Sequence, residues 1–198
     1  VFIISDVVGL WLYRRHYDKR NLTILIPAAI IGTVLGYIFA TQVADSAVRF
    51  LIGIVGVLAC LNSWLRMDRG QPPHPADWPR GLFWGTITGF TSFISHAGAP
   101  AYNMYILPQR LDKMTFAGTS TIFFAFVNFI KIPPYWALGQ LSWDHSGLML
   151  LYAPFAVAGA MLGLYLTRKL NERHFLLTVQ IGLFVISLKL IYDSHLMW

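Results

Sequence analysis

Apolar residues gather along the chain into long runs, separated by short stretches that hold most of the charges. Six runs have roughly the length that a hydrocarbon layer about 30 Å thick requires of a spanning helix. We predict helices over residues 22–41, 47–65, 81–109, 114–130, 146–167 and 174–192. A seventh run, residues 1–13, is too short to span and begins without Met, so we interpret the chain as a fragment that lacks its N-terminal part. The pattern predicts an all-α, polytopic membrane protein.

The run over residues 81–109 differs from the others because its centre is polar. It holds no Lys, Arg, Asp or Glu, but the sequence SHAGAP stands in its middle, at residues 95–100. Gly permits unusual backbone angles and Pro removes a hydrogen-bond donor, so both interrupt helices. Irregular backbone at membrane depth is tolerated only where it is buried in protein or lines a cavity, as in transporter binding sites. We therefore predict a broken or re-entrant helix and a solute transporter.

Composition and charge bear on topology more than on function. Apolar residues make up 56% of the 198 and the mean hydropathy is +0.56, which leaves too little polar surface for a soluble domain. Twelve of the 15 basic residues lie in four short loops, a distribution typical of cytoplasmic loops and not of a nucleic-acid interface. If residues 81–109 return to the side they entered from, all twelve are cytoplasmic, and only Arg49 and Lys131 lie near the outer face. We favour this re-entrant topology.

A Pro-x4-Gly-x3-Gly pattern occurs twice, beginning at Pro27 and at Pro154. Upstream of the two copies, Asp6 and Asn128 occupy matching positions. With a re-entrant topology the copies have opposite orientations, as the inverted repeats of transporters do. The alternative is chance, because Gly-x3-Gly spacing is common in membrane helices. We predict the end of a first repeat in residues 1–70, a cytoplasmic linker in residues 71–80, and a second repeat in residues 81–198.

Several of these stretches resemble one family. They are GFTSFISHAGAP at residues 89–100, LPQ at 107–109, GTS at 118–120 and PPY at 133–135, and together they resemble the TauE/SafE family of sulfite exporters. The resemblance extends over the whole chain. It implies a multi-pass protein of the bacterial inner membrane, with two related halves, that exports sulfite, sulfoacetate or another sulfur-containing anion. The chain has Gly98-Ala99-Pro100 where the family commonly has Gly-Gly-Pro, and it holds only the second copy of the Gly-rich segment.

Candidate substrate-binding or coupling residues cluster first at the helix break. His96 is a candidate because an imidazole suits either proton coupling or contact with an anion, and the half-helix that begins near Pro100 offers amides that bind an anion without a fixed positive charge. Hydroxyl donors and the break itself complete the set, with Ser92, Ser95, Gly98 and Tyr102. The alternatives are a structural kink, a histidine that bonds a freed carbonyl, and hydroxyls that bond back to their own helix.

A second group lies in residues 114–130 and in the short first run. Thr119 and Ser120 precede Asn128, the repeat counterpart of Asp6. A carboxylate and an amide at equivalent positions in apolar helices predict a polar centre where the two halves meet, at which Asp6 carries a proton. The alternative is that Asp6 lies at a membrane boundary.

These features predict a secondary transporter that exports sulfite or a related small sulfur-containing anion by alternating access. Its expected partners are that anion and the lipid bilayer, and the sequence leaves open whether the chain forms a homo-oligomer. The alternatives are a passive anion channel and a transporter of an unrelated small solute. We expect no enzyme, because no Gly-x-Ser-x-Gly turn is present and the adjacent Ser95 and His96 point apart on a helix. No cofactor or metal is expected, because the six histidines form no His-x3-His pair and Cys60 is the single cysteine.

Overall fold

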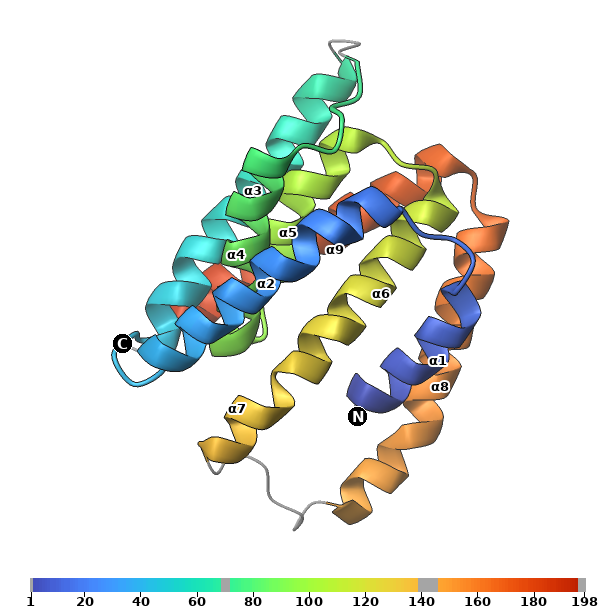
Figure 1. The fold of residues 1–198 in the computed structure, drawn as a ribbon. Helices are drawn as coiled ribbons and strands as arrows, with labels where there is room; N and C mark the ends of the chain where they lie inside the picture. The colour runs from blue at the N-terminus through green and yellow to red at the C-terminus, as the bar shows by residue number, and fades with distance from the viewer. Residues whose placement is uncertain (1, 69–71, 139–145, 196–198) are drawn as a thin grey trace. The chain divides into compact units, whose positions relative to one another are not determined.

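The computed structural model describes residues 2–68, 72–138 and 146–195, and this part of the chain is helical without a strand (Figure 1). Each predicted run forms a helix, and the run over residues 81–109 is divided. The elements in chain order are α1 (Phe2–Tyr13), α2 (Lys19–Phe39), α3 (Asp45–Asp68), α4 (Trp78–Ser95), α5 (Ala99–Ile106), the 3-10 helix η1 (Leu107–Gln109), α6 (Lys113–Ile130), α7 (Ile132–Ala137), α8 (Ser146–Lys169) and α9 (Glu172–His195).

Four stretches of the described residues are long and apolar enough to cross a membrane. They are Lys19–Phe39, Asp45–Leu65, Lys113–Ala137, which joins α6 to α7, and Glu172–Ser194. Large apolar side chains on these stretches are exposed, for example Leu51, Phe129 and Val185. A surface of this kind suits contact with lipid tails. The chain is therefore an all-helical, multi-pass membrane protein, as the sequence predicts.

Carboxylates in the loops fix where two helices begin. Asp77 Oδ1 accepts a hydrogen bond from the Arg80 backbone N–H (2.9 Å), and Asp112 Oδ1 accepts from the backbone N–H groups of Met114 (3.1 Å) and Thr115 (3.0 Å). Such N-caps satisfy donors that have no partner within the helix. Burial is the largest single influence on the pKa of Asp112 and raises it, but the hydrogen bonds from Thr115 and Met114 and the charge of His16 together outweigh burial and lower the pKa.

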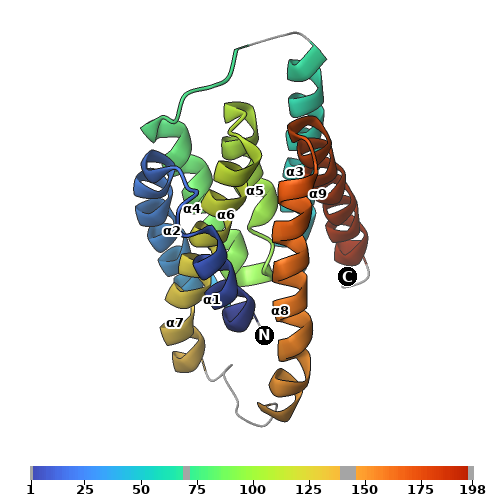
Figure 2. The same ribbon diagram turned by 90° about the vertical axis from the view of Figure 1, so that its right-hand side faces the viewer.

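By its contacts the chain divides into two compact units, and the first, unit 1, consists of residues 1–22 and 112–175. In unit 1, α1 lies beside α6 and α8 (Figure 2). The Tyr13 hydroxyl donates to Thr167 Oγ1 (3.3 Å), which joins α1 to α8, and the rings of Phe116 and Phe175 meet edge to face at 5.9 Å.

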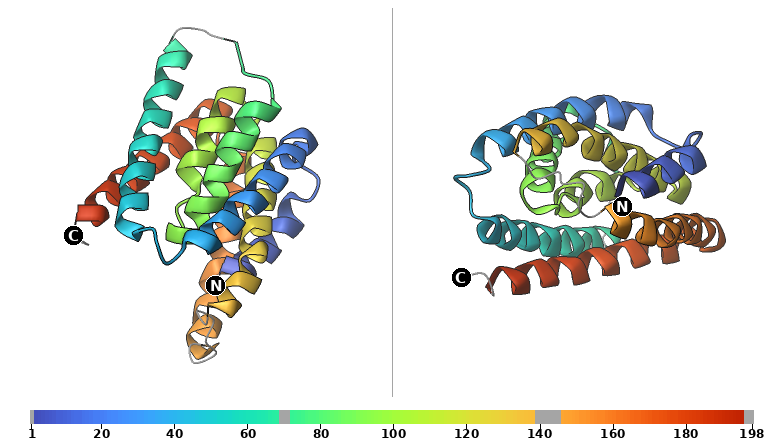
Figure 3. Two further views of the ribbon diagram at one scale, coloured as in Figure 1. Left: turned by 60° about the vertical axis from the view of Figure 1, so that its left-hand side comes forward. Right: turned by 90° about the horizontal axis from the view of Figure 1, so that it is seen from below.

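The second, unit 2, consists of residues 23–111 and 176–198 and contains α3, α4, α5 and most of α2 and α9. Gly32 lets α2 approach α4 closely, because a Cβ at this position would stand 2.8 Å from the Phe90 amide nitrogen. Helices α3 and α9 lie side by side (Figure 3), with the Cys60 thiol donating to the Gln180 carbonyl (3.3 Å). Each unit combines segments from both sides of the predicted linker, so the repeat boundaries at residues 70 and 81 stay a prediction.

Candidate functional site

The helix break lies between α4 and α5, where the sequence predicts it. Helix α4 ends at Ser95, and His96 adopts left-handed backbone angles (φ 52°, ψ 22°). The backbone N–H groups of His96 and Ala97 both reach the Thr91 carbonyl, the latter at 3.3 Å. Pro100 lies in the first turn of α5, where backbone N–H groups have no acceptor within the helix, so a residue without an N–H is tolerated there. The chain therefore turns within three residues and starts a new helix.

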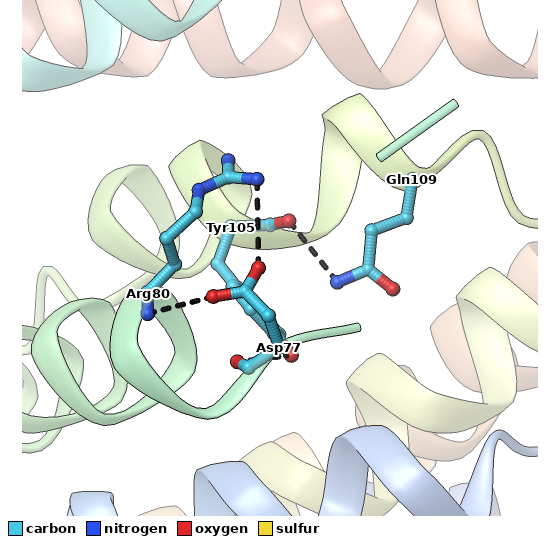
Figure 4. A network of polar contacts seen from close by, with 4 residues as sticks. All are labelled: Asp77, Arg80, Tyr105 and Gln109. Carbon is cyan, nitrogen blue, oxygen red and sulfur yellow. Dashed lines mark hydrogen bonds and ion pairs between the residues drawn. The ribbon is translucent and has the colours of Figure 1, made fainter. Parts of the chain in front are cut away.

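Helix α5 returns along α4, and a polar network holds the two together (Figure 4). The Tyr105 hydroxyl donates to the Asp77 carbonyl (3.4 Å), and Gln109 Nε2 donates to the Tyr105 carbonyl (3.2 Å). The Asp77 carboxylate also faces the Arg80 guanidinium at 3.7 Å. Farther along, the His74 backbone N–H donates to the Pro108 carbonyl (3.0 Å). The two ends of the stretch 78–109 therefore lie together, and the stretch has the form of a hairpin.

The predicted site residues at the break come together in unit 2, and most of them are buried. The buried ones are Ser92, Ser95, Gly98, Pro100 and Tyr102. His96 is exposed. Its side chain and that of Ser95 thus have different surroundings, as expected of neighbours at a helix end.

Gly98 is the position where two backbone segments come closest at the break. A Cβ there would stand 2.9 Å from the Ser92 Cβ and 3.0 Å from the Thr88 carbonyl oxygen. No side chain caps α5, since Gly98 occupies the N-cap position and makes no side-chain hydrogen bond. The first amides of α5 are thus left uncapped by a side chain.

Two buried polar atoms of this hairpin have no hydrogen-bond partner in the described part of the chain. They are Ser95 Oγ and Asn103 Oδ1, on side chains that are each 8% exposed. Asn103 Nδ2 donates to the Ala99 carbonyl (2.8 Å), so only the oxygen of this amide is unpaired. A buried polar atom without a partner costs about 1–3 kcal/mol, a cost that calls for a ligand or water at the site. Asn103 is absent from the sequence predictions, although an amide one turn into an apolar half-helix is a signal for it.

A second polar cluster lies in unit 1, where Asp6 and Asn128 are in direct contact. Asn128 Nδ2 donates to Asp6 Oδ2 at 2.8 Å, which joins α1 to α6 at matching repeat positions. Lys131 follows α6 directly, is only 3% exposed, and its positive charge acts on Asp6. The sequence predicts Lys131 near the outer face, and the burial of its side chain was not predicted, because burial depends on how the helices pack.

Asp6 lines two cavities of unit 1. One, of about 260 Å³, is apolar apart from Asp6 and has Leu10 and Phe126 in its wall. The other, of about 330 Å³, lies between α1, α6 and α8, with the hydroxyls of Tyr13 and Ser120 in its wall. The carboxylate therefore borders space on two sides.

Thr119 and Ser120 bond elsewhere than to Asp6. Thr119 Oγ1 accepts from the Asp18 backbone N–H (2.8 Å) and so holds the loop between α1 and α2. Ser120 Oγ donates back to the Phe116 carbonyl (2.8 Å). Thr119 thus has a structural task, whereas Ser120 reaches the cavity beside Asp6.

Over the residues that the structure describes, no group of three His, Cys, Asp or Glu side chains is arranged to hold a metal ion.

Comparison with known proteins gives one match. The model of the family described as sulfite exporter TauE/SafE matches residues 1–190. No curated protein and no solved structure was found to be similar to the chain.

Proposed function

Because the chain belongs to the TauE/SafE sulfite exporter family it is a membrane transporter, and we propose that it exports sulfite or a related small sulfur-containing anion by alternating access. The membrane is the bacterial inner membrane in this proposal. The interrupted helix carries the proposal, because in one short hairpin it combines amides that no side chain caps with a buried hydroxyl that has no partner among the described residues. Passive channels also use interrupted helices, so the transport assay below separates the two mechanisms.

The break is suited to an anion because it offers donors without a fixed charge. Backbone amides at a helix N-terminus point outward and carry partial positive charge. Gly98 keeps this end of α5 free of a side chain, and Ser95 Oγ adds a hydroxyl donor nearby in the chain. A sulfite oxygen would satisfy the hydroxyl that lacks a partner in the described structure. His96 is the proposed titratable group at the mouth of this site, since its side chain is exposed.

The proposed mechanism also needs two related halves, and contacts in unit 2 support an inverted relation between them. Gly53 and Gln180 are as far apart in sequence as the two Pro-x4-Gly-x3-Gly patterns are, and so are Cys60 and Ser187. Gly53 approaches Ser187, and Cys60 bonds to Gln180. From Gly53 to Cys60 along α3, the partner on α9 moves backward from Ser187 to Gln180. The equivalent helices therefore run antiparallel, as inverted repeats require. The re-entrant hairpin is part of the same proposal.

Sulfite flux into proteoliposomes that contain the full-length protein tests this function. We expect saturable flux with counterflow, and for Ser95→Ala a KM about tenfold or more higher, since a hydrogen bond to a charged group contributes about 1.5–3 kcal/mol. Folding should not suffer, because this hydroxyl bonds to no described group. Ser194→Ala is the matched control: it removes another buried hydroxyl, which bonds back to the Ile191 carbonyl (2.6 Å).

Each failure of this experiment has a distinct meaning. Flux no higher than in empty liposomes, from protein shown to be folded, would reject sulfite as the substrate. Flux that does not saturate and shows no counterflow would replace the transporter mechanism with a channel. Equal KM values for Ser95→Ala and wild type would move the anion site away from the break.

A further inference from the structure

The Asp6–Lys131 pair of unit 1 has a role that the anion site at the break does not explain. Lys131 lies within the stretch Lys113–Ala137, which is apolar enough to cross a membrane, and only 3% of its surface is exposed. Asn128 on α6 lies three residues before Lys131 and holds the Asp6 carboxylate through the 2.8 Å hydrogen bond, so the positive charge of Lys131 acts on Asp6. The two charges sum to zero, and neutralising either side chain would change the charge that the other one faces.

Energetics argue against a purely structural pair. A buried charge that an opposite charge balances, as Asp6 balances Lys131, seldom stabilises a protein more than apolar residues of the same size would, whereas loss of the opposite charge is strongly destabilising. Ionisable side chains within membrane helices most often mark ion pathways and proton relays. Burying these charges therefore costs free energy, and the net charge of the pair changes when either side chain is neutralised.

A proton on Asp6 is the change that the surroundings allow. The carboxylate borders a cavity of about 330 Å³ whose wall also holds Tyr13 and Ser120, so the site has room and polar partners for water that would carry a proton to Asp6. Lys131 is the charged side chain that α6 brings to Asp6, and α8 brings Ala160 and Gly163 to the cavity wall. Tyr13 of α1 is the other titratable group in this wall. A metal cation such as Na⁺ would be repelled by the Lys131 ammonium, whereas a proton neutralises Asp6 without adding a second ion.

We propose that Asp6 and Lys131 couple anion binding to proton binding: a proton on Asp6 leaves the Lys131 ammonium to be balanced by the transported anion, which enters beside Asp6. When Asp6 gives up the proton, its carboxylate again balances Lys131 and repels the anion. Anion and proton therefore bind together and leave together, and each raises the affinity for the other by the same factor. This inference rests on the proposed transport of an anion, but not on sulfite as that anion.

The test uses purified full-length protein and three variants. Asp6→Asn imitates the protonated carboxyl, Lys131→Gln removes the ammonium, and Asp193→Asn is a matched acid-to-amide control near the end of α9. Sulfite binding is measured by calorimetry in two buffers of different ionisation enthalpy, which counts the protons taken up with the anion. Sulfite exchanges a proton itself, but equally in all variants, so the difference between wild type and Asp6→Asn belongs to Asp6.

We expect wild type and Asp193→Asn to take up as much as one proton more per anion than Asp6→Asn does. Relative to that variant, their affinity should rise by as much as about tenfold for each unit by which the pH is lowered. Lys131→Gln should bind the anion more weakly and lose the coupling. Should it not fold, the double variant Asp6→Asn/Lys131→Gln, which leaves no unpaired charge, replaces it and should show weak, uncoupled binding. Equal proton uptake in wild type and Asp6→Asn would overturn the proposal.

A second measurement separates this inference from the choice of substrate. The infrared band of a protonated carboxyl, present in wild type and absent in Asp6→Asn, is followed against pH without any anion. The midpoint pH of this titration should be lower in wild type than in Lys131→Gln. It should become higher when sulfite, sulfoacetate or sulfate is added. If only sulfite has no effect, sulfite fails as the substrate and the coupling stands. If none of the three anions moves the midpoint, the coupling is refuted.

Discussion

The replacement Gly32→Ala tests a close contact between the backbones of α2 and α4 in unit 2. The new Cβ would stand 2.8 Å from the Phe90 amide nitrogen and 2.9 Å from the Thr86 carbonyl carbon, and nearer still to the Thr86 oxygen. All three are backbone atoms, so α2 and α4 must move apart. Overpacking of this kind costs about 1–3 kcal/mol, and Ala regains up to about 1 kcal/mol of helix propensity. With backbone as the obstacle, we expect a net loss of about 2 kcal/mol, or about 4–8 °C in Tm at this chain length.

The repeat supplies the matched control, Gly159→Ala. No described atom lies within 4 Å of a Cβ at Gly159, so this variant should keep the wild-type Tm or exceed it by a few degrees. Thermal unfolding in detergent micelles, followed by near-UV circular dichroism, measures all three proteins. A Gly32→Ala protein as stable as wild type would refute the reasoning. An equal loss in both variants would assign the cost to alanine itself and not to the contact between α2 and α4.

Two further predictions concern polar groups that hold helices in place. Asp112→Ala should lose about 1 kcal/mol through the missing N-cap of α6. The pKa of Asp112 is lowered on folding, so this stabilisation is complete at a pH above the unfolded-state pKa near 4. It disappears as the pH falls through the folded-state pKa. The Tm values of wild type and Asp112→Ala should therefore converge as the pH is lowered from 7 to 3. Gln180→Leu should destabilise the protein by about 1–3 kcal/mol, because Trp64 Nε1 (2.7 Å) and Ser63 Oγ (2.8 Å) both lose their partner. Thermal unfolding followed by tryptophan fluorescence measures the loss. A Gln180→Leu protein with unchanged Tm would contradict this assignment.

The helices could be predicted from the sequence because the membrane imposes their length and the charges mark their ends. Each predicted run is a helix, and the interruption lies at residues 96–98, directly before Pro100 and including Gly98. The short α7 was missed, because Pro133 and Pro134 suggest a loop, although both fit the first turn of a helix. The space around Gly159, where no described atom lies within 4 Å of an added Cβ, could not be predicted either. The same repeat pattern packs tightly at Gly32, and only the packing of α2 distinguishes the two positions.

The candidate site was predictable where it depends on chain order and unpredictable where it depends on packing. The break gathers its residues locally, and the hydrogen bond between Asp6 and Asn128 follows a match that the repeat makes visible. Lys131 is different, since a basic residue before two prolines reads as a loop residue at the membrane surface. Its burial depends on how the helices pack, and in this unit α1 packs against α6. The part that Thr119 plays in holding the loop at Asp18 likewise depends on a contact between distant residues.

Transport requires a site that binds an anion firmly enough to select it and weakly enough to release it. A fixed cation in an apolar surrounding would hold an anion too strongly, since attraction between charges rises steeply as the dielectric constant falls. On our proposals the chain avoids this by dividing the task. The break in unit 2 offers neutral donors, and in unit 1 the charge of Lys131 is balanced by Asp6 until a proton arrives. Affinity then depends on one proton, so a change of pH between the two sides of the membrane changes which side releases the anion.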